Sequence, residues 1–136
     1  MKRSILAFVA ALVLWIVVIS VLNRGLRVVI AGYAADEPTM SFTLGMLVAR
    51  LAIGALTSLI AGAVAAWIAP ASPRMPLLLG TTLFLAFIPV HLRLWSFFPF
   101  WYHLIFLGTL IPLVVLGSRL SRMRLQAGAP AGSARM

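Results

Sequence analysis

Four long apolar stretches divide this chain, and they constrain its fold more than any other feature. They run over Ile5–Leu22, Leu44–Ala69, Met75–Leu92 and Phe97–Gly117. A helix of about 18 residues is about 27 Å long, close to the ~30 Å hydrocarbon core of a bilayer. Because lipid cannot hydrogen-bond to the backbone, stretches of this kind cross a membrane as helices. We therefore expect an all-α polytopic membrane protein, a compact bundle of four transmembrane helices.

The composition supports the same conclusion. Of the 136 residues, 63% are hydrophobic and only 10% are charged, whereas about 25% are charged in an ordinary soluble domain. The chain has no cysteine, which excludes disulfides, thiolate nucleophiles and iron–sulfur clusters. The first loop and the tail are too short to fold alone. We expect one transmembrane domain over residues 1–118, and a tail over residues 119–136 that is basic and then disordered from Ala127 onward.

The positions of the basic residues predict the orientation. If the four stretches cross in turn, seven basic residues lie on the side of the amino terminus and three on the other side, the latter next to both acidic residues. The seven are Lys2, Arg3, Arg74, Arg119, Arg122, Arg124 and Arg135, and the three are Arg24, Arg27 and Arg93. Because basic residues are retained in the cytoplasm, both termini are expected there. Ten of the eleven basic residues are arginine, a bias that suggests a bacterial protein, so we expect a bacterial inner membrane. The first stretch exceeds a signal peptide's apolar region, so it is expected to be a retained helix.

Small side chains recur every four residues in the second stretch, at Gly54, Ser58, Gly62 and Ala66. This spacing places them on one helix face, and such a face lets another helix approach closely. We call these four residues the small-residue stripe. It predicts helix packing, with a helix of the same chain favoured over a second copy.

Arg50 lies four residues before Gly54, so it projects from the same helix face. A charge inside a span is costly and is often functional. One interpretation is that Arg50 extends toward the outer surface and forms an ion pair with Asp36 or Glu37, the only acidic residues. The other is that it contacts an anion or a substrate.

Two histidines flank the short link between the third and fourth stretches. His91 is near the end of one and His103 is about one turn into the next, so their imidazoles lie at similar depth on adjacent helices. Such a pair is a weak candidate for holding haem or a metal ion, and the alternative is two interfacial polar residues. The nearby Trp95, Trp101 and Tyr102 are typical of an aromatic belt at headgroup depth.

The absence of acidic residues from the four stretches, and of any catalytic motif, narrows the functions that we expect. No stretch contains Asp or Glu, which disfavours carboxylate-coupled transport, and no catalytic set is evident, so we do not expect an enzyme or a bound cofactor. The favoured hypothesis is a structural or accessory subunit that associates with itself or with a larger membrane complex, in contact with lipid and not with nucleic acid. The alternative is a minimal channel or transporter subunit that acts as an oligomer, with Arg50 in the pathway. A haem-binding protein is the third hypothesis.

Overall fold

The computed structural model describes residues 1–129, and these form a compact helical bundle. Its helices are α1 (Lys2–Val29), the single-turn α2 (Tyr33–Asp36), α3 (Leu44–Ile68), α4 (Met75–Arg93) and α5 (Phe100–Ala127). All but α2 are long and apolar enough to cross a membrane. The predicted fold class, an all-α bundle of four such helices, is confirmed.

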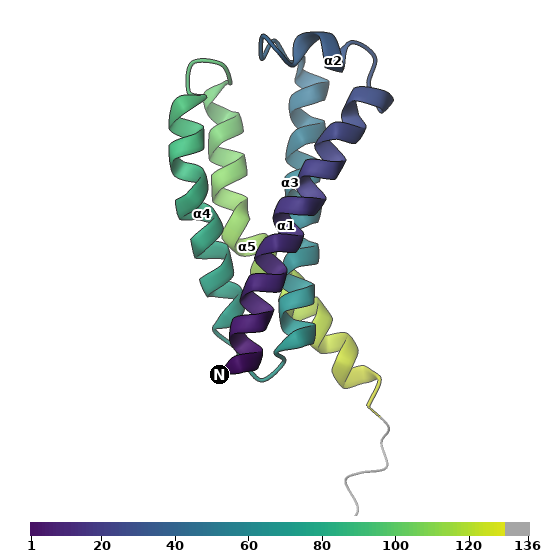
Figure 1. The fold of residues 1–136 in the computed structure, drawn as a ribbon, viewed down its shortest axis with the longest axis vertical. Helices are drawn as coiled ribbons and strands as arrows, with labels where there is room; N and C mark the ends of the chain where they lie inside the picture. The colour runs from purple at the N-terminus through teal and green to yellow at the C-terminus, as the bar shows by residue number, and fades with distance from the viewer. Residues whose placement is uncertain (130–136) are drawn as a thin grey trace, which may run out of the picture.

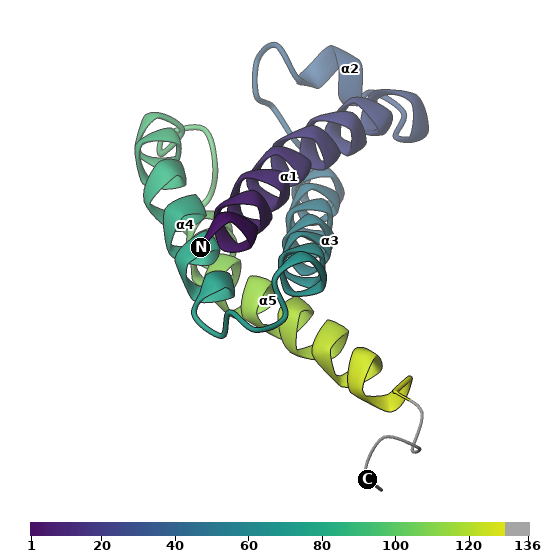
Figure 2. The same cartoon turned by 60° about the horizontal axis from the view of Figure 1, so that its bottom comes forward.

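The long helices alternate in direction along the chain. Figure 1 shows the amino terminus and the end of α5 at one end of the bundle, and α2 at the other end. We call these the terminal end and the α2 end. Helix α1 lies beside α3, and α4 lies beside α5 (Figures 1 and 2). These two pairs are close to each other near the terminal end, and one pair diverges from the other toward the α2 end. The α5 helix crosses α3, and its last turns extend beyond the bundle (Figure 2).

The helix boundaries differ from the predicted spans mainly in α1 and α5, since α3 and α4 agree within one residue and α1 begins three residues early, at Lys2. The α1 helix continues past Leu22 to Val29, because the segment has no proline and a single glycine, Gly25, does not end a helix. The α5 helix begins at Phe100 instead of Phe97, since extended Pro99 precedes its first turn. It also continues through the segment predicted as a separate basic tail and ends at Ala127. Residues 130–136, most of the segment predicted to be disordered, lie outside the described residues.

The crossing of α3 and α5 brings the two backbones into direct contact. A methyl group added at Gly62 would lie 1.9 Å from the carbonyl oxygen of Val114, and one added at Gly117 would lie 2.0 Å from that of Leu59. No side chain fits at either position. The same face of α3 places Gly54 against the ring of Phe106, also on α5.

The other helices complete the core around this crossing. All four residues of the small-residue stripe are buried, and Ser58 accepts a 3.1 Å hydrogen bond from the indole Nε1 of Trp15 on α1. Ser58 in turn donates to the carbonyl oxygen of Gly54 at 2.8 Å. The stripe therefore contacts α1 and α5 of its own chain. The main apolar cluster includes Ala7, Ala11, Ala61, Ala65, Leu79, Leu83, Leu110 and Val114.

Candidate functional site

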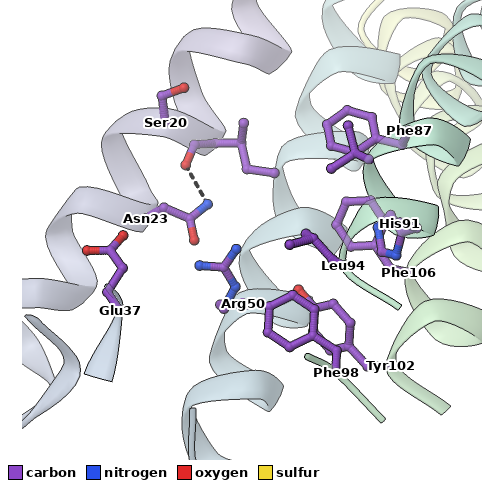
Figure 3. Close-up of a pocket in the computed structure, with 12 residues that line it drawn as sticks. Ser20, Asn23, Glu37, Arg50, Phe87, His91, Leu94, Phe98, Tyr102 and Phe106 are labelled. Carbon is purple, nitrogen blue, oxygen red and sulfur yellow. Dashed lines mark hydrogen bonds between the residues drawn. The ribbon is translucent and has the colours of Figure 1, made fainter. Parts of the chain in front are cut away.

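A cavity of about 300 Å³ lies between the four long helices where they diverge toward the α2 end (Figure 3). Its volume is at the lower end of the range for small-molecule sites. One side is polar and the other is mainly aromatic. The lining residues are Ile19, Ser20, Asn23, Glu37, Arg50, Phe87, Val90, His91, Leu94, Phe98, Tyr102 and Phe106.

Arg50 is the charged centre of this cavity. Its Nη1 donates a 2.6 Å hydrogen bond to the hydroxyl of Tyr33, a fully buried residue of α2. The guanidinium carbon lies 4.9 Å from the ring centroid of Phe42, a cation–π contact. The Nε atom of Arg50 is buried and has no hydrogen-bond partner. Arg50 is thus held in place by neutral groups and keeps a free N–H donor.

The expected ion pair of Arg50 with Asp36 or Glu37 is not formed, and this interpretation is corrected. Glu37 instead accepts from Arg27 at 2.5 Å. Arg27 is in the last turn of α1, and the short α2 connection brings Glu37 next to it. Within residues 1–129, no carboxylate lies within ion-pair distance of Arg50.

Asn23 of α1 adds a second unsatisfied polar group. Its Nδ2 donates to the carbonyl oxygen of Ile19 at 2.8 Å, whereas its Oδ1 is buried without a partner. Figure 3 shows this amide above the Arg50 guanidinium, with the Glu37 carboxylate on the same side of the cavity. The polar wall therefore presents an unused acceptor on Asn23 and an unused donor on Arg50.

The two predicted histidines do meet. One imidazole donates its Nδ1–H to Nδ1 of the other, and the distance between these atoms of His91 and His103 is 2.7 Å. Both residues are buried, and Trp95 stacks on His103 with ring centroids 4.8 Å apart. His91 also lines the cavity, but His103 does not.

This arrangement does not fit a bis-histidine haem. The porphyrin iron must lie between the two ligating nitrogens, whereas here the two nitrogens are in direct hydrogen-bond contact. Across the described residues, no group of three or more metal-ligating side chains is present either. The pair is instead a structural link between α4 and α5 beside the cavity.

The aromatic residues near the α4–α5 link separate into two groups. Trp95 is half exposed, as a belt residue should be. Tyr102 is only 4% exposed and lines the cavity, with its ring 4.9 Å from that of Phe98. Its expected place in the belt is therefore wrong, because this face of α5 packs inward.

Three residues at the site were not predicted to lie there. Asn23 and Tyr102 line the cavity and Tyr33 binds Arg50 beside it, and of these only Tyr102 was part of a predicted pattern, the aromatic belt. A polar residue directly after the predicted first span was a weak signal for Asn23, and no sequence signal pairs Tyr33 with Arg50. Comparisons of the chain with protein-family models, curated proteins and solved structures give no match.

Proposed function

We propose that this protein is a small multi-pass membrane protein that acts as an accessory subunit rather than as an enzyme, and that it binds the anionic group of a ligand in the Arg50 cavity. The observation that carries the proposal is Arg50 itself, a partly buried cation that faces a cavity with no carboxylate within ion-pair distance in the described chain. A charged side chain costs about 2.5–3.5 kcal/mol at the centre of a membrane helix on insertion scales, and less toward the ends of the helix. A bound anion offsets that cost.

The net charge of the site favours an anionic ligand over a cationic one. Arg27 neutralises Glu37, so the charged groups near the cavity leave one net positive charge on Arg50. Guanidinium groups bind phosphate and carboxylate oxygens with paired N–H donors. The free Nε–H of Arg50 is available for such a contact.

A channel within one chain is less well supported. The cavity lies toward the α2 end, and on the terminal side the space between the helices is filled by buried residues such as Ala11, Ala65, Leu79 and Val114. The α3–α5 crossing at Gly62 adds direct backbone contact there. A pathway that includes Arg50 would therefore have to form between copies, and flux measurements in proteoliposomes test that alternative.

The proposed location is a bacterial inner membrane with both termini in the cytoplasm, as the basic residues favour. The chain lacks cysteine, so single cysteines report topology cleanly. Ser96→Cys, in the α4–α5 link, should react with an impermeant maleimide on spheroplasts. Ser4→Cys and Ser121→Cys should react only after permeabilisation, and the opposite pattern would contradict this topology.

Gentle purification from the native membrane, followed by mass spectrometry of bound molecules and subunits, tests the function. Wild type should carry an anionic species that Arg50→Gln lacks. Arg24→Gln is the matched control, because it removes an exposed arginine of α1 that does not line the cavity. If wild type and Arg50→Gln carry the same molecules, the cavity is not the binding site. If the protein is a lone monomer without a partner subunit, the accessory role is wrong.

A further inference from the structure

We infer that the ligand of the Arg50 cavity is a membrane phospholipid, held by its phosphate and by a hydroxyl-bearing headgroup such as phosphoglycerol, which enters sideways between α1 and α4. This inference rests on the proposed function and names the ligand class. Three features of the cavity support it: its lateral opening, its depth in the bundle and its pair of unused polar atoms.

The opening lies between α1 and α4. These helices contact each other through Trp15 and Phe87, whose rings are 4.9 Å apart, and they diverge from there toward the α2 end (Figures 1 and 2). The cavity lining includes exposed residues on each side of this opening, Ser20 on α1 and Val90 on α4. Both belong to helices that are long and apolar enough to cross a membrane, and in a bilayer the opening between them would face lipid. A ligand that enters here comes from the bilayer.

The depth of the charge suits a lipid headgroup. Arg50 is six residues from the start of α3, about 9 Å along the helix axis. A long arginine side chain at this depth reaches the headgroup region. The lining toward α4 and α5 is apolar or aromatic, including Phe87, Leu94 and Phe106. A headgroup at Arg50 would therefore leave its glycerol and acyl chains against apolar side chains and the bilayer.

The two unused polar atoms specify the headgroup. The Nε–H of Arg50 requires an acceptor, which a phosphate oxygen supplies, and Oδ1 of Asn23 requires a donor, which a hydroxyl supplies. A phosphoglycerol headgroup carries both groups and one negative charge. A phosphoethanolamine headgroup is neutral overall, and its ammonium would lie beside Arg50 while Glu37, the carboxylate of the cavity lining, is engaged by Arg27. The site is therefore expected to prefer phosphatidylglycerol.

The experiment measures lipid binding by native mass spectrometry of protein that has been delipidated in mild detergent. Phosphatidylglycerol, phosphatidylethanolamine and soluble glycerol 3-phosphate are added separately. Wild type should bind phosphatidylglycerol at least tenfold more tightly than phosphatidylethanolamine. Arg50→Gln should lose at least tenfold in this affinity, Asn23→Leu should lose the preference between the two lipids, and Arg24→Gln should behave as wild type.

Size-exclusion chromatography first establishes that the variants are monodisperse. The remaining outcomes then separate failure of the lipid inference from failure of the proposed function. If glycerol 3-phosphate binds in an Arg50-dependent manner and phosphatidylglycerol does not, the ligand is soluble: the lipid inference is overturned and the proposed function stands. If Arg50→Gln binds phosphatidylglycerol as wild type does, the lipid binds at another surface and the inference is overturned. If no probe binds and no anionic species co-purifies from the native membrane, the proposed function fails as well.

Discussion

Replacing Gly62 with alanine tests whether the α3–α5 crossing organises the bundle. The new methyl group would lie 1.9 Å from the carbonyl oxygen of Val114, and real contacts of this kind are essentially never shorter than 3.0 Å. The obstructing atom belongs to the backbone of α5, so no side-chain rotation relieves this contact. The helices must separate by about 1 Å, and the contacts on both sides of the crossing weaken.

The cost follows from two opposing effects. Overpacking a tight contact costs about 1–3 kcal/mol, and a rigid backbone neighbour favours the upper end. Alanine regains about 1 kcal/mol because it forms helix better than glycine. We expect Gly62→Ala to lose about 2 kcal/mol, a fall in the thermal midpoint of about 8 °C at about 4 °C per kcal/mol for a chain of this size.

Gly108→Ala is the matched control on α5, because a methyl group added there meets nothing within 4 Å. It should leave the thermal midpoint unchanged or raise it. The midpoints are measured by tryptophan fluorescence of purified protein in mild detergent. The double variant Gly62→Ala/Gly117→Ala should lose less than the sum of its two single changes, since both residues meet at one crossing. Equal midpoints for Gly62→Ala and Gly108→Ala would refute this account of the crossing.

Three further predictions concern hydrogen bonds between helices, two of them buried and one partly buried. Each is tested by the thermal midpoint in the same detergent. Ser58→Ala should cost about 1–3 kcal/mol, because it leaves the Trp15 indole donor buried without its partner, and the double variant Ser58→Ala/Trp15→Phe should recover part of the loss. His91→Phe should cost a similar amount because it removes the partner of His103; a midpoint equal to wild type would show that the pair does not link α4 and α5. Tyr33→Phe should cost about 1.5–3 kcal/mol, since it removes the acceptor of a charged donor, Arg50, and no loss in this variant would mean that the guanidinium finds another acceptor.

The sequence predicted the helices well because hydropathy depends on local composition. Runs of apolar residues gave four spans, and each is found within or close to a helix of the structure. The ends were less accurate. The α5 helix continues past the predicted end at Gly117, because arginine and leucine both favour helix whether or not lipid surrounds them.

Helical spacing also predicted which side chains share a face. Arg50 and the small-residue stripe lie on the inward side of α3, as the four-residue period indicates. Spacing does not identify the partner across that face. The ion pair with Asp36 or Glu37 was expected because these are the only acids, and the structure pairs Glu37 with Arg27 instead.

By itself, the sequence determined four helices apolar enough to cross a membrane and the inward face of α3, since each follows from apolar content and a fixed helical period within one segment. Only the tertiary structure decided that Tyr33 holds Arg50, that Asn23 lies beside it and that the two histidines touch. These contacts depend on the crossing of α3 with α5 and on the divergence of α1 from α4. Such angles are set by how residues far apart in the chain pack together, which no local pattern encodes.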